Sequence, residues 1–207
     1  MTAAASAANA RPRAPRSTYS AVAITLHWLI AALVLTNIGL AWYFGTLPRL
    51  AQVGPVQLHK SIGITVLLLT LVRIAWRLTN PPPKLPAAMP AWERYAAMTL
   101  HTLFYLLLLA MPLSGWAMVS ASPLIRVHPT VLYGVVPWPA VPYPGLDSDA
   151  LHDAHKLFER THDTLALIAY AMILLHVAAA LKHQFLDRDE VLGRMLPLAR
   201  RNPGATR

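Results

Sequence analysis

The most constraining feature of this chain is an apolar run of 24 residues, from Ala21 to Phe44, that contains no Lys, Arg, Asp or Glu. A helix needs about 20 mostly apolar residues to cross the hydrocarbon core of a bilayer. The run is longer than the apolar region of a secretory signal peptide, and it contains His27. It therefore predicts a membrane-spanning helix that is retained.

Three further apolar runs follow, at about residues 56–78, 96–120 and 164–181. Charged residues make up 13% of the chain, about half of their share in an average soluble domain, which argues against a soluble enzyme. Four spans predict an all-α integral membrane protein that folds as a four-helix bundle. We expect a disordered segment at residues 1–18, the transmembrane domain at residues 19–197 and a basic tail at residues 198–207.

The chain carries a formal net charge of +9, and the distribution of this charge predicts the topology. Twelve Lys and Arg residues lie before the first run, between the second and third runs or after the fourth run, whereas the other two loops hold four. Loops rich in Lys and Arg remain in the cytoplasm, so both termini are expected there. Because the basic residues form short clusters rather than one stripe, we expect a lipid bilayer and no nucleic acid as partner.

The chain contains no Cys, which excludes disulfide bonds, iron–sulfur clusters, Cys-ligated zinc and covalently attached c-type haem. The chain is rich in histidine, a common metal ligand. Nine His residues are present, and their positions relative to the four runs carry the functional argument.

Four histidines lie within or at the ends of the predicted spans, where an ionisable side chain is costly and commonly functional: His27, His59, His162 and His176. His162 and His176 are 14 residues apart, so they share one face of the fourth helix at a separation of roughly 21 Å. That separation is too large for one metal ion. His27 is expected at the same depth in the membrane as His176, and His59 at the same depth as His162. Two facing pairs suit two bis-His haems, although packing histidines, proton relays and metal transporters use similar residues.

Several short motifs follow one another along the chain. They are Tyr19-Ser20 with His27-Trp28; His59-Lys60-Ser61 with Gly63-Ile64; Val72-Arg73 with Trp76-Arg77-Leu78; Pro81-Pro82-Pro83; His101 with Tyr105-Leu106-Leu107; Met111-Pro112-Leu113-Ser114-Gly115-Trp116; His162-Asp163-Thr164-Leu165-Ala166 with His176; and Arg194-Met195-Leu196-Pro197. Taken in order, these motifs resemble those of the bacterial cytochrome b561 family, small four-helix membrane proteins with two b-type haems. The likeness runs from about residue 19 to residue 197.

The resemblance implies that His27 and His176 hold a haem b on the cytoplasmic side, and that His59 and His162 hold a second haem b on the outer side. It also implies electron exchange between the membrane quinone pool, with ubiquinone as substrate, and a donor or acceptor at the outer face. The donor would be a small anion, with superoxide as the leading example, or a redox protein. The implied location is the bacterial inner membrane.

Further residues are expected to support the cofactors. Arg73 and Arg77 lie one turn apart at the cytoplasmic end of the second span, where they can pair with haem propionates or act as ordinary cytoplasmic-side anchors. Gly63 lies one turn past His59, where it allows a flat macrocycle to approach the backbone or allows close helix packing.

Three more side chains are candidates for substrate binding. His183 and His101 lie near the cytoplasmic end and can hydrogen-bond a quinone, with a structural role as the alternative for His101. Lys60 lies near the outer end and, with the basic residues of the outer loops, can attract a small anion. Scattered solvated charges are the alternative there.

Two other functions remain open at this point. A cytochrome b subunit that anchors a hydrogenase or dehydrogenase complex has the same architecture, although the short cytoplasmic loops favour a stand-alone protein or a homodimer. A His-based proton or metal transporter is the alternative from another class. A reduced-minus-oxidised absorption spectrum distinguishes the transporter from a haem protein.

Overall fold

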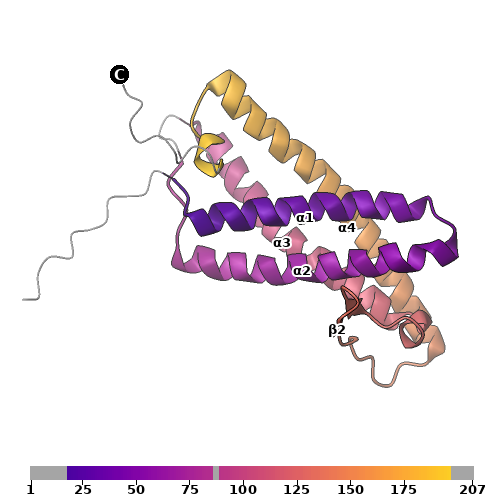
Figure 1. Cartoon of the computed structure of the whole chain (residues 1–207). Helices are drawn as coiled ribbons and strands as arrows, with labels where there is room; N and C mark the ends of the chain where they lie inside the picture. The colour runs from indigo at the N-terminus through magenta and orange to yellow at the C-terminus, as the bar shows by residue number, and fades with distance from the viewer. Residues whose placement is uncertain (1–17, 86–88, 197–207) are drawn as a thin grey trace, which may run out of the picture.

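The computed structural model describes residues 18–85 and 89–196 of the 207-residue chain. The expected disordered segment, apart from Thr18, and the expected basic tail lie outside the described residues. Within the described ranges, four long helices and one small β-hairpin form the framework (Figure 1).

Each of the four apolar runs is a helix. The helices are α1 (Ala21–Gly45), α2 (Val53–Thr79), α3 (Ala91–Ala121) and α4 (Ser148–Lys182). All four are long and apolar enough to cross a membrane, which confirms the expected four-helix membrane bundle. The shorter elements are the 3₁₀ helices η1 (Arg49–Gln52), η2 (Pro123–Arg126) and η4 (Gly193–Met195), the π-helical turn η3 (His183–Asp187), and the strands β1 (Val131–Leu132) and β2 (Val136–Pro137).

Two of the four long helices begin at a polar residue whose side chain accepts a hydrogen bond from a backbone N–H of the first turn. This N–H has no partner inside the helix. Ser20 Oγ accepts the Ala23 N–H at 3.2 Å and also the indole N–H of Trp76 on α2 at 2.9 Å. Asp147 Oδ1 accepts the Ala150 N–H at 2.8 Å and caps α4. Helix α4 therefore begins well before its apolar run.

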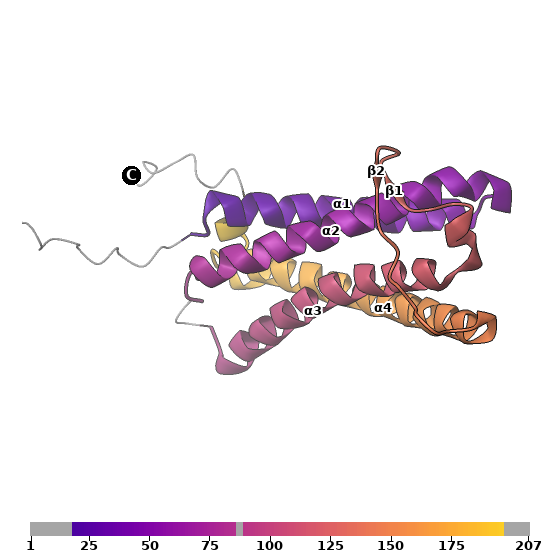
Figure 2. The same cartoon turned by 90° about the horizontal axis from the view of Figure 1, so that it is seen from below.

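The helices form two layers, α1 beside α2 and α3 beside α4 (Figure 1 and Figure 2). A small hydrophobic cluster lies inside each layer: Ile30, Ile62 and Val66 in the first, and Leu107, Ala169 and Met172 in the second. Helix α2 also packs on α3, whereas α1 and α4 are not among the closely packed helix pairs of the described chain. Contacts between α4 and the first layer therefore depend on a few long side chains.

The bundle has two distinct ends. Helices α1 and α3 begin, and α2 and α4 end, at the end where both the first and the last described residues lie, here called the terminus end (Figure 1). The opposite end, here called the loop end, carries the long connection between α3 and α4.

The connection from α3 to α4 contains an antiparallel hairpin that the sequence analysis did not predict. Leu132 pairs with Val136, and Val131 pairs with Pro137. Figure 2 shows the hairpin lying across α2 rather than continuing beyond the loop end. The stretch from Pro137 to Gly145 contains no helix, as its prolines lead one to expect.

Candidate functional site

At the terminus end, the rings of His27 on α1 and His176 on α4 face each other. Their centroids are 6.2 Å apart, and their planes make an angle of 65°. Phe104 on α3 contacts the His176 ring edge-on at 5.3 Å, and Trp28 contacts the His27 ring in the same way at 5.3 Å. Aromatic side chains therefore flank the pair on both sides.

At the loop end, the rings of His59 on α2 and His162 on α4 form a second pair. Their centroids are also 6.2 Å apart, with an angle of 74° between the planes. Phe44, near the end of α1, contacts the His59 ring at 5.5 Å. The structure thus brings together the histidines that the sequence pairs by depth.

The separation within each pair suits two imidazoles that share one metal ion. With metal–nitrogen bonds of about 2 Å on either side of the ion, the ring centroids would be roughly 6 Å apart. Both pairs join α4 to the opposite layer, where direct helix packing is sparse. Because His162 and His176 lie 14 residues apart on one helix, the two pairs are separate sites.

Backbone carbonyls fix the orientation of both rings at the loop end. His59 Nδ1 lies 3.3 Å from the carbonyl oxygen of Asn37, and His162 Nδ1 lies 3.1 Å from the carbonyl oxygen of Met111. A carbonyl oxygen can only accept a hydrogen bond, so each Nδ1 carries the proton. Each Nε2 is then left as the nitrogen that can bind a metal, an arrangement typical of metal-ligating histidines.

The residues around this loop-end pair fit a bis-imidazole haem. A Cβ atom on Gly115 would lie 3.0 Å from Cε1 of His162, so the ring occupies space that only glycine leaves open. Ser114 Oγ lies 3.1 Å from His162 Nδ1 and supports the same orientation. The side-chain oxygen Oδ1 of Asn37 is buried and has no hydrogen-bond partner among the described residues, so a polar acceptor is available beside the pair.

Two arginines lie beside the terminus-end pair, as the sequence leads one to expect, together with Tyr105. Arg73 Nε donates to the hydroxyl oxygen of Tyr105 at 3.2 Å. The guanidinium carbons of Arg73 and Arg77 lie 5.9 and 5.6 Å from the centroid of the Tyr105 ring. Arg73 also acts electrostatically on both His27 and His176. This group provides positive charge for an anionic group of a cofactor.

Tyr19 joins this group from the segment before α1. Burial raises the pKa of its phenol above the ordinary value, while Arg77 and Arg73 act in the opposite direction. The neutral phenol is therefore the favoured form of Tyr19 across the physiological pH range.

At the terminus end, two hydrogen bonds join segments that are far apart in the sequence. The indole N–H of Trp28 donates to the carbonyl oxygen of Met195 at 2.7 Å, and Arg194 Nη1 donates to the carbonyl oxygen of Lys84 at 2.9 Å. The last described segment is thereby tied to α1 and to the connection between α2 and α3. Residues that the sequence analysis recognised only as separate motifs meet here.

His101 on α3 also lies beside the terminus-end pair. Its ring centroid is 5.8 Å from that of His176, so three imidazoles gather at this level. The structure leaves open both of the roles expected for His101, a quinone contact and structural support.

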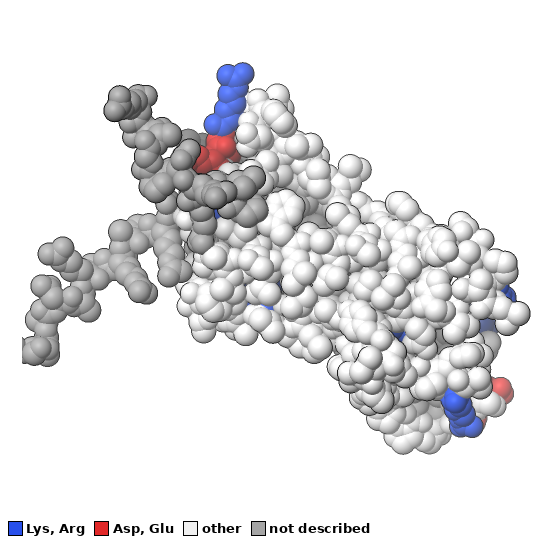
Figure 3. Space-filling model, viewed as in Figure 1, with Lys and Arg blue, Asp and Glu red and all other residues white. Residues whose placement is uncertain are grey.

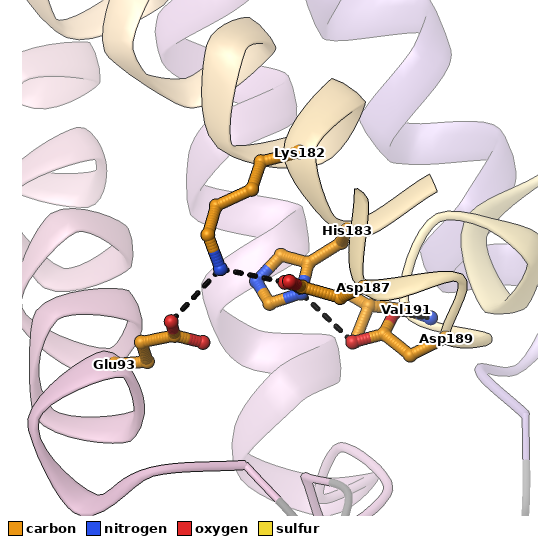
Figure 4. Close-up of polar contacts among 6 residues, drawn as sticks. All are labelled: Glu93, Lys182, His183, Asp187, Asp189 and Val191. Atoms are coloured by element: carbon orange, nitrogen blue, oxygen red, sulfur yellow. Dashed lines mark hydrogen bonds and ion pairs between the residues drawn. The ribbon is translucent and has the colours of Figure 1, made fainter. Parts of the chain in front are cut away.

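His183 lies in a network of charged groups at the end of α4 (Figure 4). Its Nδ1 is 2.8 Å from Asp189 Oδ2 and 3.1 Å from Asp187 Oδ2. The Lys182 ammonium bridges Asp187 Oδ2 at 2.6 Å and Glu93 Oε1 on α3 at 2.8 Å. Glu93, His183 and Asp187 bring possible metal-ligand atoms within 4.8 Å of one another, but the Lys182 cation already pairs with both carboxylates.

The structure gives the other two expected residues less support. Gly63 faces α1, where a Cβ atom would make an ordinary contact of 3.9 Å with Asn37 Nδ2. Close helix packing explains this glycine as well as cofactor binding does. Lys60 is half-buried near the loop end and makes no hydrogen bond or ion pair with any described residue.

Three contributions to the loop-end site were missed by the sequence analysis. The carbonyl groups of Asn37 and Met111 leave no signal in a sequence, because every residue has one. Gly115 was recognised as part of the Ser114-Gly115-Trp116 motif but received no role. A glycine within a predicted span, in a motif that recurs in a haem-binding family, was the available signal.

Comparison with known proteins places this geometry in a family. The family model for prokaryotic cytochrome b561 matches residues 18–198. Cytochrome b561 homolog 2 of Escherichia coli K12 is 33% identical over 186 residues, which cover 86% of this chain and 90% of the relative. Probable superoxide oxidase CybB of Yersinia pestis is 32% identical over 183 residues, which cover 88% of this chain and 97% of the relative. Cytochrome b562 of Cereibacter sphaeroides is 33% identical over 189 residues, which cover 86% of this chain and 94% of the relative.

The family match spans all of the described helices, and the four spans agree with it. The chain therefore belongs to the prokaryotic cytochrome b561 family and is a haem b electron-transfer protein of the bacterial inner membrane.

Proposed function

We propose that this protein carries two b-type haems and relays electrons between a donor at the loop end and ubiquinone at the terminus end. His27 with His176 would hold one haem, and His59 with His162 the other. The observation that carries the proposal is the equal 6.2 Å separation of the two histidine pairs, at two levels of one bundle.

The two histidines of each pair would hold a haem between them. The haem would then supply single-electron transfer rather than binding of a substrate. The protein contributes the orientation of the rings through the Asn37 and Met111 carbonyl groups. It also contributes positive charge from Arg73 and Arg77, suited to haem propionates.

The terminus end would face the cytoplasm. The unequal distribution of Lys and Arg, twelve residues against four, supports this orientation. The donor would then approach the loop end from the periplasm, where Lys60 and the basic residues of the outer loops attract anions. The relative from Yersinia pestis bears the name probable superoxide oxidase, which supports superoxide as the donor.

The quinone would bind at the terminus end, close to His183 and His101. The two carboxylates that engage His183 Nδ1 leave Nε2 as the nitrogen that can hydrogen-bond a quinone oxygen. Reduction of a quinone takes up protons as well as electrons, and this end of the bundle would draw those protons from the cytoplasm. A homodimer is compatible with this arrangement, as is a monomer.

Haem content tests the ligand assignment directly. The purified wild-type protein should contain two haems per chain and show a b-type α-band in its reduced-minus-oxidised spectrum. His176→Ala and His162→Ala should each retain one haem, and the double variant should retain none. Two haems per chain in either single variant would contradict the pairing, and the absence of an α-band would contradict the relay itself.

A second experiment tests the substrates. Protein in vesicles that contain ubiquinone should show haem reduction when superoxide is generated outside, followed by reoxidation as ubiquinol accumulates. Superoxide dismutase should abolish the signal. If the haems are reduced by ubiquinol but not by superoxide, the proposed donor is wrong while the relay stands.

A further inference from the structure

The connection between α3 and α4 has an unusual composition for a loop outside the membrane. Between Arg126 and Asp147 lie 20 residues without a single Lys, Arg, Asp or Glu. The stretch includes Tyr133, Trp138 and Tyr143, residue types that are enriched at the boundary between lipid and water. A loop exposed to water on all sides has no physical reason to exclude charge over this length.

The hairpin in this connection is attached along α2 by three hydrogen bonds at successive helical turns. Gln57 Nε2 donates to the carbonyl oxygen of Pro129 at 2.9 Å, and the Tyr133 N–H donates to Ser61 Oγ at 2.9 Å. The hydroxyl groups of Tyr133 and Thr65 lie 2.7 Å apart. The hairpin therefore lies against the outside of α2 and extends along this helix from the loop end towards the middle of its length.

These contacts extend past the last charged residue at the outer part of α2. Thr65 lies five residues beyond Lys60, or roughly 7 Å further along the helix axis, and the next charge on α2 is Arg73. Thr65 is also 12 residues from the start of α2, roughly 18 Å, in a bilayer whose hydrocarbon core is about 30 Å thick. The Tyr133 hydroxyl thus reaches a depth where the helix surface itself is apolar, while the Tyr133 backbone lies at the level of Ser61.

The N–H groups of the tip are paired, as a membrane requires, because an unpaired N–H group in hydrocarbon costs several kcal/mol. The Tyr133 N–H is bound by Ser61, the Gly134 N–H by the carbonyl oxygen of Val131 at 3.3 Å, and the Val135 N–H by that of Leu132 at 3.0 Å. Tyr133 adopts the left-handed conformation, with φ of 51°, to make this turn. These bonds hold a conformation that a bulky residue otherwise avoids.

The outward surface of the hairpin is apolar. Val135 is 78% exposed, Tyr133 is 55% exposed and Val136 is 53% exposed. The face in Figure 3 that covers α1, α2 and the hairpin is almost free of charged side chains, which gather towards its two ends. The hairpin surface is therefore continuous with the apolar surface of the spans.

We propose that the hairpin Val131–Pro137 is seated in the lipid leaflet at the loop end, packed against α2, with Tyr133, Val135 and Val136 in contact with acyl chains. It is a membrane-embedded element between two spans, and it does not project into the aqueous phase. The proposal depends on the four spans and not on the number of haems or on the substrate.

The absence of Cys makes a direct test possible, because any introduced Cys is the only labelling site. Val135→Cys and Val136→Cys would each be labelled with a nitroxide in the full chain, reconstituted into lipid nanodiscs with its haem spectrum checked against the parent. Leu68→Cys, on the exposed face of α2, is the matched lipid-facing control, and Ser148→Cys, at the start of α4, is the matched aqueous control.

Collision of the label with oxygen, which partitions into lipid, and with a water-soluble nickel chelate is then measured by power saturation. The ratio of oxygen to nickel access at residues 135 and 136 should resemble that at residue 68 and exceed that at residue 148 severalfold. A ratio equal to that at residue 148 would overturn the proposal, because the hairpin would then be in water. Exclusion of both reagents at residues 135 and 136 would also overturn it, because a second copy of the chain would then cover the hairpin.

Discussion

A Cβ atom on Gly115 of α3 would lie 3.0 Å from Cε1 and 3.2 Å from Nδ1 of His162 on α4. The imidazole therefore rests against bare backbone of α3. The same helix supplies the Met111 carbonyl group that binds His162 Nδ1 at 3.1 Å. Helix α3 contributes none of the four paired histidines, yet it determines the position and tautomer of one of them.

Gly115→Ala should therefore disturb the loop-end haem selectively. The added methyl group must displace the His162 ring, and overpacking of this kind costs about 1–3 kcal/mol. We expect partial or complete loss of one haem, with the spectrum of the terminus-end haem unchanged. Haem content per chain and the low-spin EPR signals of the two haems provide the measurement.

Gly39→Ala on α1 is the matched control, because a Cβ atom there would meet no atom within 4 Å. It should retain both haems. If Gly115→Ala and Gly39→Ala retain the same haem content and signals, then the contact between Gly115 and His162 does not determine haem binding.

Replacing Arg73 with Gln should lower the reduction potential of the terminus-end haem. Oxidised haem carries one more positive charge than reduced haem, so a nearby cation favours the reduced state and its removal favours the oxidised state. A decrease of some tens of millivolts is expected at this haem, with little change at the other. Redox titration monitored in the α-band measures both potentials.

Arg126→Gln, at the loop end, is the control for a general effect of removing positive charge. It should leave the potential of the terminus-end haem unaltered. Equal shifts of both haem potentials in Arg73→Gln would show that Arg73 does not lie preferentially beside one of them.

Much of this architecture could be predicted from the sequence because hydrocarbon tolerates so few arrangements. Long apolar runs predicted the four helices, and the 14-residue interval between His162 and His176 predicted that these two residues share one face of α4. Asp147, a residue type typical of helix caps, directly precedes α4. Each of these signals is local, or it follows from the period of the α-helix.

The contributions that escaped prediction are those that depend on contacts between distant segments. The two-residue strands β1 and β2 are too short for an alternating pattern, and Pro137 argues against a strand. The carbonyl groups that accept hydrogen bonds from His59 and His162 lie on other helices, α1 and α3. These contacts depend on how the helices pack, which no sequence pattern indicates. The ion pair between Lys182 and Glu93 joins residues that are 89 positions apart.

The half-buried phenol of Tyr19 predicts a loss of stability at alkaline pH. Because burial raises its folded-state pKa above the unfolded value near 10, Tyr19 holds its proton more tightly in the folded protein. Its contribution to stability is therefore fully present below pH 10 and is lost as the pH rises towards the folded pKa. Tyr19→Phe has no proton to lose, so its melting temperature should fall less steeply above pH 10.

Thermal unfolding in detergent between neutral pH and strongly alkaline pH measures this slope. Tyr95→Phe, at an exposed position of α3, should retain the wild-type slope. Identical slopes for wild type and Tyr19→Phe would show that Tyr19 ionises equally readily in the folded and unfolded chain.

Asp189→Asn should weaken the reaction with quinone and leave both haems in place. The carboxylate of Asp189 holds His183 Nδ1 at 2.8 Å, and an amide in its place loses the charge-assisted part of that bond. A loss of about 1.4 kcal/mol at this contact corresponds to a tenfold effect. We therefore expect KM for a soluble ubiquinone analogue to rise about tenfold, while the rate at which the external donor reduces the haems stays at the wild-type value.

Glu190→Gln supplies the matched control, because Glu190 is the adjacent carboxylate, is 84% exposed and lies 3.8 Å from Arg194. It should keep the wild-type KM. The decisive comparison is between the two half-reactions of Asp189→Asn, followed separately by stopped-flow absorbance. Slower haem reduction together with slower quinone reduction would indicate a general structural defect, and unchanged kinetics in both would remove His183 from the quinone site.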